Sequence, residues 1–274
     1  MKKIFQRLIV FFPQQNHLLF NLVTIAFTVL GAVEFRNILT HKNLYISVPE
    51  AVILGAIGPV AWTTVVSFGV TNHIIPAAFI LGASWLFVSR IFASQEKLDG
   101  YIGRATAGLS LMIYPGFFMS WIVQMAVLRE AGREASMIIL VFFLVVFLND
   151  AAAWLAGYLL GKNNRGLVPA SPNKSVAGFI GGIAASVGIG IIAASVIPAA
   201  FTSPEMSSTL AGALLGLGAG IAATLGDLGE SAVKRSAGVK DSGSLILGRG
   251  GALDSIDSLI LAAPVYYFLY LLLF

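Results

Sequence analysis

The chain has 274 residues, of which 57% are hydrophobic and only 11% are charged. Soluble domains carry roughly 25% charged residues, so this composition excludes a water-soluble globular protein and indicates a polytopic membrane protein. The absence of cysteine excludes disulfides and thiolate metal sites, and a net charge of +4 dispersed over loops indicates contact with membrane lipid rather than with nucleic acid.

Apolar runs of roughly 17 to 25 residues, the length that crosses a bilayer, recur along the chain. We expect about eight spans, near residues 17–36, 50–69, 74–92, 105–128, 136–160, 176–200, 207–225 and 258–274. The predicted fold is all-α, a polytopic transmembrane helical bundle of about eight to nine spans. Within one structural unit, residues 1–135 form an N-terminal transmembrane region and residues 136–274 a C-terminal region with the polar loops.

Two of the expected spans are rich in small residues, Ala177–Ala200 and Ala211–Ala223. Small residues let helix backbones approach closely in lipid, so the pattern predicts tight helix packing. A glycine-lined substrate groove is the alternative.

Lysine and arginine gather in alternate loops. They are frequent in residues 36–42, 90–104, 162–174 and 234–249, and absent from residues 69–73 and 201–207. Because basic loops stay on the cytoplasmic side, the loops 162–174 and 226–257 are expected to face the cytoplasm from the inner membrane.

Three polar features before residue 226 carry possible chemistry. Asp150 follows an apolar run and is either a functional carboxylate or a helix-end residue in headgroup water. The turn Ser171-Pro-Asn173-Lys174-Ser175 can bind phosphate at a helix start or can be an ordinary turn with an N-cap. Glu34 either pairs with Arg36 or reaches the site.

The stretch 226–257 is a polar, glycine-rich island in this apolar chain. As a helical continuation of the preceding span, it places Asp227, Glu230, Ser231 and Lys234 at i, i+3, i+4 and i+7, on one face. A glycine-rich turn at 248–251 then precedes Asp254 and Asp257. Acids for Mg²⁺ and bases for phosphate therefore occur together, inside apolar walls that suit a lipid substrate.

A long gapped pattern in this island resembles the signature of the phosphatidate cytidylyltransferase (CDP-diacylglycerol synthase) family. It reads Ser231-Ala-Val-Lys234-Arg235, four residues, Lys240-Asp241, then Leu247-Gly248-Arg249-Gly250-Gly251-Ala-Leu-Asp254-Ser255-Ile-Asp257. The likeness extends upstream to Asp150 and to the turn 171–175.

The resemblance implies an enzyme that joins phosphatidic acid to CTP, giving CDP-diacylglycerol and pyrophosphate with two Mg²⁺ ions, and a possible homodimer. The implied metal ligands are Asp227 and Asp254, aided by Asp150 or Asp257. The implied basic clamps on phosphate are Lys174, Lys234, Arg235 and Lys240. The other implied phosphate-binding residues are Ser171, Asn173, Ser175, Ser231, Gly248, Arg249, Gly250 and Gly251.

The signature departs from the family pattern at three positions. Arg249 stands for a histidine, Ser255 for an arginine and Leu247 for a proline. The first change replaces a group that can transfer a proton with a permanent cation. Two alternatives therefore stay open: a nucleotidyltransferase for another lipid phosphate, and a non-catalytic lipid-binding or transport protein on the same frame.

Overall fold

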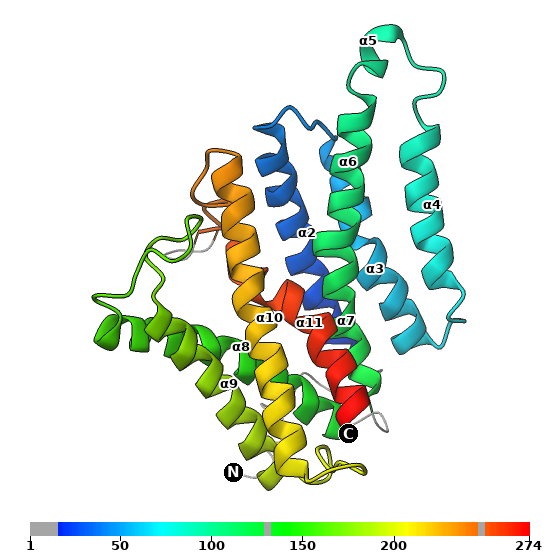
Figure 1. Cartoon of the computed structure of the whole chain (residues 1–274). Helices are drawn as coiled ribbons and strands as arrows, with labels where there is room; N and C mark the ends of the chain where they lie inside the picture. Colours follow the sequence, from blue (N-terminus) through cyan, green and yellow to red (C-terminus); the bar gives the residue numbers. More distant parts are fainter. Residues whose placement is uncertain (1–15, 129–132, 246–249) are drawn as a thin grey trace. The chain divides into compact units, whose positions relative to one another are not determined.

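The computed structural model describes residues 16–128, 133–245 and 250–274 (Figure 1). These residues form helices and no β-strand. In chain order the elements are α2 (Leu18–Thr40), α3 (Val48–Phe68), α4 (Ile74–Val88), α5 (Gln95–Leu98), α6 (Tyr101–Leu111), η1 (Met112–Phe117), α7 (Phe118–Gln124), η2 (Met125–Val127), α8 (Arg133–Leu160), α9 (Val176–Val196), α10 (Ser208–Ser236) and α11 (Leu253–Leu273).

The predicted all-α membrane fold is confirmed. Seven helical segments among the described residues are long and apolar enough to cross a membrane, one of them the continuous run from α6 to η2. The expected span at 74–92 is the shorter α4, an apolar helix of 15 residues. The expected span at 207–225 extends to Ser236, and the last span begins at Leu253 rather than at 258.

The chain divides into two compact units that are interleaved along the sequence. Among the described residues, the N-terminal unit lies within 14–124 and 233–256, and the C-terminal unit lies within 125–232 and 257–274. The predicted division at residue 135 stays a prediction.

In the N-terminal unit, local signals start the helices and small residues pack them. Ser47 and Glu50 form a capping box at the start of α3, where each side chain bonds the other residue's backbone N–H. α3 packs on α2, and a Cβ built on Gly55 would lie 2.4 Å from the Cβ of Ala32. Around Pro115 the chain widens into the π-helical η1, because proline lacks the N–H that a regular turn needs.

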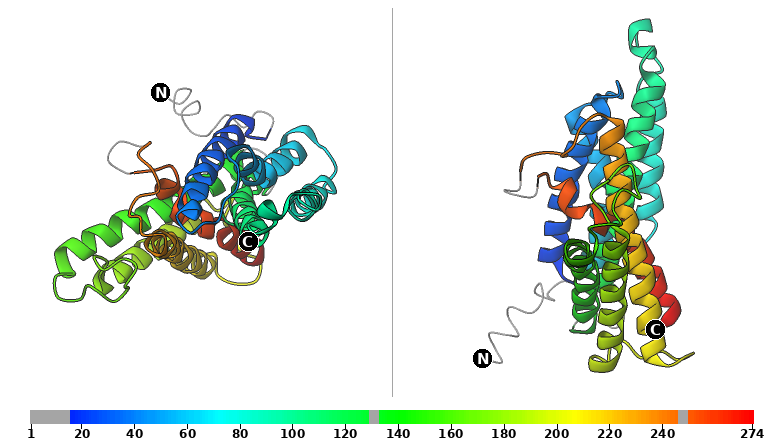
Figure 2. Two further views of the ribbon diagram at one scale, coloured as in Figure 1. Left: turned by 90° about the horizontal axis from the view of Figure 1, so that it is seen from above. Right: turned by 60° about the vertical axis from the view of Figure 1, so that its left-hand side comes forward.

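In the C-terminal unit, α8 packs along α9, and both views of Figure 2 show these two helices side by side. A Cβ on Gly181 would lie 2.4 Å from the Cβ of Ala156 on α8. A Cβ on Gly190 would lie 1.9 Å from the carbonyl oxygen of Gly212 on α10. The backbones touch where the small residues are, which confirms the tight packing expected from their pattern.

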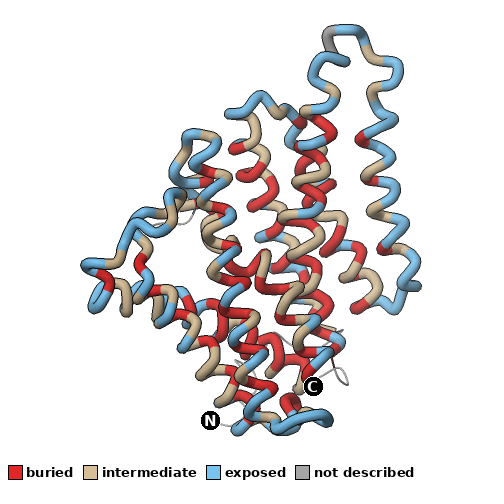
Figure 3. The backbone as a smooth tube through the Cα atoms, viewed as in Figure 1, coloured by how far each residue is buried: buried red, intermediate tan, exposed pale blue. Residues whose placement is uncertain are grey.

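Burial in both units follows the pattern of a protein whose solvent is lipid. Large apolar side chains such as Trp154 and Leu81 are 71% and 70% exposed, whereas Glu230 and Asn149 are 1% and 2% exposed. In Figure 3 much of α4 is coloured as exposed, whereas α9 is coloured mainly as intermediate and buried. Glu230 and Asn149 therefore lie inside the helical packing of the C-terminal unit, away from lipid.

Candidate functional site

The C-terminal unit joins the turn before α9 to the face of α10. Lys174 donates from Nζ to Asp227 Oδ2, and the side chains are 26% and 27% exposed. Ser231, one turn further along α10, donates to Asp227 Oδ1 at 3.5 Å. The structure therefore brings together three predicted site residues, at a place that water and a ligand can reach.

Three further carboxylates belong to the C-terminal unit, Asp150, Glu230 and Asp257. The Ser258 hydroxyl on α11 donates to Asp150 on α8 at 3.2 Å. The neighbouring Asp257 interacts electrostatically with Asp227, Glu230 and Asp150. Asp257 on α11 thus lies within electrostatic reach of three other carboxylates of its unit.

Asn149, next to Asp150, has a structural role. Its buried amide donates to Ser186 on α9 at 3.0 Å and to the Gly220 carbonyl on α10 at 3.3 Å. Its oxygen accepts a bond from Thr224 at 3.3 Å. This amide therefore ties α8, α9 and α10 together one residue before Asp150.

The turn 171–175 has two parts with different roles. Ser175 is 3% exposed and caps α9, since its hydroxyl accepts from Gly178 N at 3.0 Å. The Ser171 carbonyl accepts from Lys174 N at 3.1 Å, which closes the turn and directs Lys174. Asn173 is exposed at the same turn. The N-cap alternative describes Ser175, while Lys174 remains a candidate phosphate ligand.

In the N-terminal unit, Asp254 at the start of α11 is held from two sides. Lys234 Nζ lies 2.5 Å from its Oδ1, and both side chains are nearly buried. The backbone amides of Gly251 and Ser242 donate to its Oδ2 at 2.7 and 3.0 Å. Only Oδ1, which faces a lysine, can exchange its partner without disturbing the backbone.

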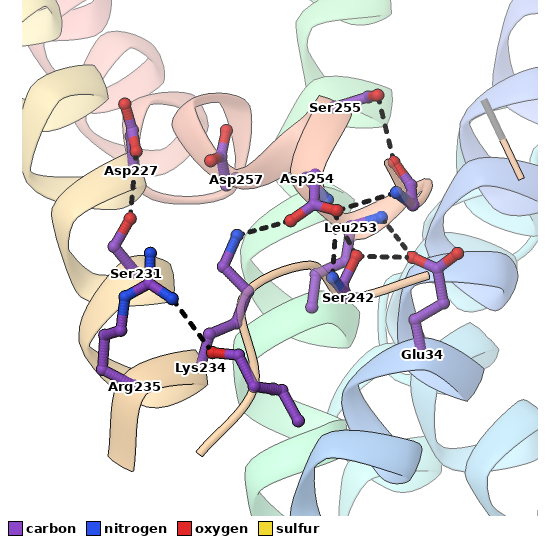
Figure 4. A network of polar contacts seen from close by, with 12 residues as sticks. Glu34, Asp227, Ser231, Lys234, Arg235, Ser242, Leu253, Asp254, Ser255 and Asp257 are labelled. Atoms are coloured by element: carbon purple, nitrogen blue, oxygen red, sulfur yellow. Dashed lines mark hydrogen bonds and ion pairs between the residues drawn. The ribbon is translucent and has the colours of Figure 1, made fainter. Parts of the chain in front are cut away.

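A residue far away in the sequence completes this arrangement. Glu34 on α2 accepts from the Ser242 hydroxyl at 3.0 Å and from the amides of Ala252 and Leu253 at 3.0 and 2.7 Å (Figure 4). Arg36 instead bonds the Ile46 carbonyl at 2.8 Å. Of the two alternatives for Glu34, the structure supports the second, in which Glu34 reaches the site, because its contacts are Ser242, Ala252 and Leu253.

Gly250 and Gly251, the described glycines of the turn 248–251, lie close to these carboxylates. A Cβ on Gly251 would lie 2.2 Å from both Glu34 Oε2 and Ser242 Oγ. Gly250 has φ +97°, and a Cβ there would lie 2.5 Å from Asp254 Oδ2. Both positions therefore require glycine, for close approach and for the left-handed backbone of Gly250.

The remaining predicted site residues are placed less centrally. Arg235 is exposed and donates to the Val239 carbonyl at 3.3 Å, and Lys240 is exposed. The Ser255 hydroxyl donates to the Gly251 carbonyl at 3.2 Å. Leu247, Gly248 and Arg249 lie outside the described residues.

Sequence reasoning missed two residues as site members, Ser242 and Ser258. It did place Glu230 on the helical face of Asp227, although it did not assign Glu230 as a metal ligand. The two serines had no usable signal, since each acts through a partner more than ten positions away.

The donor groups fit a Mg²⁺ ion whose coordination shell is completed by phosphate oxygens of the substrate. Among the described residues, no group of three His, Cys, Asp or Glu side chains could hold a metal ion by itself. Mg²⁺ in phosphoryl-transfer sites binds through one or two carboxylates, with water and phosphate oxygens completing its shell. Asp227, with Asp257 and Asp150 nearby, supplies the oxygens in one unit, and Asp254 Oδ1 supplies one in the other.

The fold and these polar clusters define an integral membrane protein with paired acidic and basic groups at its helix ends. The model of the cytidylyltransferase family matches residues 3–273, and the chain belongs to that family.

Individual relatives agree with this assignment. The phosphatidate cytidylyltransferase of Synechocystis is 43% identical over 132 residues, 48% of this chain and 42% of that protein. The uncharacterized protein YnbB of Escherichia coli is 38% identical over 162 residues, 55% of this chain and 51% of its own. The phosphatidate cytidylyltransferase of Brucella suis is 38% identical over 208 residues, 69% and 72% of the two chains. The chain thus spans about half the length of the first two.

Proposed function

We propose that this protein transfers CMP from CTP to phosphatidic acid, giving CDP-diacylglycerol and pyrophosphate. One observation carries the proposal: each of the two principal predicted metal ligands lies against a predicted phosphate-binding lysine. Asp227 contacts Lys174, and Asp254 contacts Lys234. A metal–triphosphate complex presents both kinds of charge, so it can replace each ion pair with one bond to metal and one to phosphate. The names of the Synechocystis and Brucella relatives, both phosphatidate cytidylyltransferases, point to the same reaction.

The proposed chemistry needs charge neutralisation and alignment more than covalent catalysis. A phosphate oxygen of the lipid forms a bond to the α-phosphorus of CTP, the bond from that phosphorus to the bridging oxygen breaks, and pyrophosphate leaves with the electron pair. Lys174 and Lys234 bind phosphate oxygens, with Arg235 and Lys240 at the exposed margin. Asp227, aided by Asp150 or Asp257, would hold Mg²⁺ in one unit and Asp254 would hold it in the other, and the metal would supply neutralising charge for the phosphates.

The proposed setting is the inner membrane, with the loops 161–175 and 237–252 in the cytoplasm, where CTP is present. The excess of lysine and arginine in these loops supports this orientation. A homodimer is compatible with the small-residue helices, although the same residues also pack helices within the chain.

The direct test is an assay of the purified protein in lipid nanodiscs with radiolabelled CTP, Mg²⁺ and phosphatidic acid. We expect labelled CDP-diacylglycerol that depends on all three components and is lost with EDTA. Replacing phosphatidic acid by other lipid phosphates tests the second candidate, a nucleotidyltransferase for a different lipid. That candidate is favoured by Ser255, whose hydroxyl bonds a backbone carbonyl where the family pattern has an arginine.

Asp227→Asn is the decisive single substitution. Because the amide keeps the size of the side chain but loses its charge, we expect activity to fall at least about 100-fold. Glu205→Gln, an exposed carboxylate in the loop before α10, is the matched control and should keep wild-type activity. Full activity in Asp227→Asn would remove this residue from metal binding. If the wild type makes no product while Arg249→His with Ser255→Arg does, the chain has a degenerate site and the non-catalytic alternative gains support.

A further inference from the structure

Glu34 is a carboxylate in the apolar helix α2 and is 9% exposed. An ionisable side chain inside a membrane segment is costly unless it faces a partner or a cavity. Its oxygens accept bonds from one hydroxyl and two backbone amides, all of them from residues 242–253 of the same unit. The contacts of Glu34 therefore lie in the signature segment, more than 200 positions away.

Two of these contacts complete the start of α11. The first amides of a helix have no partner within the helix, and a carboxylate at that end also meets the positive end of the helix dipole. Glu34 accepts from Ala252 and Leu253, the last residue before α11 and its first. It thus does for α11 what an N-cap side chain does, but from another helix.

The backbone passes very close to the Glu34 carboxylate at two glycines, Gly243 and Gly251. Cβ atoms on Gly243 and Gly251 would lie 2.4 and 2.2 Å from its oxygens, so both backbones pass directly against it. A larger residue at either position would displace the carboxylate or the turn.

Ser242 connects Glu34 to Asp254. Its hydroxyl donates to Glu34 and accepts from Asp254 N at 3.3 Å, while its amide donates to Asp254 Oδ2 at 3.0 Å. Gly251, pressed against Glu34, supplies the second amide bond to Oδ2. Of the two groups that fix Oδ2, Ser242 is hydrogen-bonded to Glu34 and Gly251 passes close beside it, directly before Ala252, which Glu34 also bonds. Oδ1 is left facing Lys234 (Figure 4).

We infer that Glu34 is a positioning residue, which holds Ser242 and the start of α11 at Ala252 and Leu253 in place. It fixes the start of α11 so that Asp254 presents Oδ1 in one orientation to the metal–triphosphate complex. The effect of Glu34 on catalysis rests on the proposed function. Its hydrogen bonds can be tested whether or not the protein has that function. Groups that orient a metal ligand typically change metal affinity or activity by about 10- to 100-fold when they are removed.

The test compares Glu34→Ala and Glu34→Gln with the wild-type protein in nanodiscs. Glutamine keeps one acceptor oxygen but turns an N–H toward a backbone donor, so its effect should lie between those of alanine and the wild type. Glu50→Gln is the matched control. Glu50 is also a carboxylate at a helix start of this unit, but its partners are Ser47, Trp85 and Arg104.

Three measurements are made on each variant. Amide hydrogen exchange of residues 250–256 reports the hydrogen bonds directly. Mn²⁺ binding in the presence of CTP, followed by electron paramagnetic resonance, reports the ligand. Steady-state kinetics give kcat and the KM for phosphatidic acid. For Glu34→Ala we expect faster exchange, with Mn²⁺ affinity and kcat each about 10- to 100-fold lower and the KM for phosphatidic acid nearly unchanged.

Three outcomes would decide against the role of Glu34 as a positioning residue. Unchanged exchange would refute the bonding to the helix start. Faster exchange together with wild-type Mn²⁺ affinity and kcat would mean that Glu34 has only a structural role. If Glu50→Gln loses Mn²⁺ affinity and kcat as much as Glu34→Ala does, the losses reflect lower stability in general. If Glu34→Ala does not fold, Glu34→Gln carries the comparison. If the wild type makes no CDP-lipid, the proposed function fails, while exchange and Mn²⁺ binding still decide the role of Glu34.

Discussion

Asp227 and Asp254 share one chemical situation in this structure, since each carboxylate contacts a lysine. A cation in contact neutralises a carboxylate inside an apolar protein, where an isolated charge is costly. The same cation competes with any metal ion for the carboxylate oxygen. We therefore expect the free protein to bind divalent metal weakly and to bind it well only with CTP, whose phosphates take over the lysines.

Lys174→Gln tests this competition. Without the ammonium group, Asp227 Oδ2 loses its cation, so Mn²⁺ alone should bind more tightly than to the wild type. A charge-assisted hydrogen bond contributes about 1.5–3 kcal/mol, so the KM for CTP should rise by about tenfold or more. Titration with Mn²⁺ followed by electron paramagnetic resonance, together with initial rates at varied CTP, measures both effects.

Lys162→Gln is the control for that substitution. Lys162 is an exposed lysine at the start of the same loop, so its removal changes the net charge by the same amount. It should leave Mn²⁺ affinity and the KM for CTP near their wild-type values. Unchanged Mn²⁺ affinity in Lys174→Gln would mean that the ion pair does not compete with metal.

At the scale of the helices, α9 and α10 are joined by backbone contact rather than by interlocking side chains. The glycines at 190, 212 and 216 leave no space for a Cβ, and Asn149 adds hydrogen bonds from α8 to both helices. α10 also carries Asp227, and α9 follows the turn that holds Lys174. The close packing of these helices thus supports the contact between the two charged residues.

Gly190→Ala tests the packing. Its Cβ would meet the backbone of Gly212, which cannot move unless the helices separate, so we expect a loss of about 1–3 kcal/mol in stability. The thermal midpoint in detergent, followed by tryptophan fluorescence, should fall. Gly188→Ala is matched on the same helix, with no atom within 4 Å of the added Cβ, and should be neutral or slightly stabilising. Equal midpoints for the two variants would contradict the tight contact.

Particular residues show how far sequence reasoning reaches. The i, i+3, i+4, i+7 spacing predicts that Asp227 to Lys234 continue a helix, and α10 confirms it. The glycine-rich turn before Asp254 and Asp257 indicates a helix start there, although the apolar run alone places the last span at 258; the bond from the Leu253 amide to Glu34, 219 positions away, has no local signal. Local spacing reports only neighbours on one helix, whereas the hydrogen bonds of Glu34, Ser242 and Ser258 are set by tertiary packing.

At the scale of the whole molecule, the membrane orientation decides whether the proposed site can meet CTP. α10 separates the loop 197–207 from the segment 237–252, so the two ends of this helix must lie on opposite sides of the membrane if α10 crosses it. The first loop has no lysine or arginine, and the second has Lys240 and Arg249. The excess of basic residues favours the second loop as the cytoplasmic one.

The chain contains no cysteine, so single cysteines can report this orientation without removing native ones. Ser207 and Ser244 are exposed serines in the two loops. In intact cells, a membrane-impermeant maleimide should label Ser207→Cys and not Ser244→Cys, and permeabilised cells should label both. Asn163→Cys, in the loop between α8 and α9, should behave like Ser244→Cys because α9 and α10 together return the chain to the same side. Labelling of Ser244→Cys in intact cells would place the predicted phosphate ligands away from cytoplasmic CTP, and the proposed reaction would then lack its nucleotide.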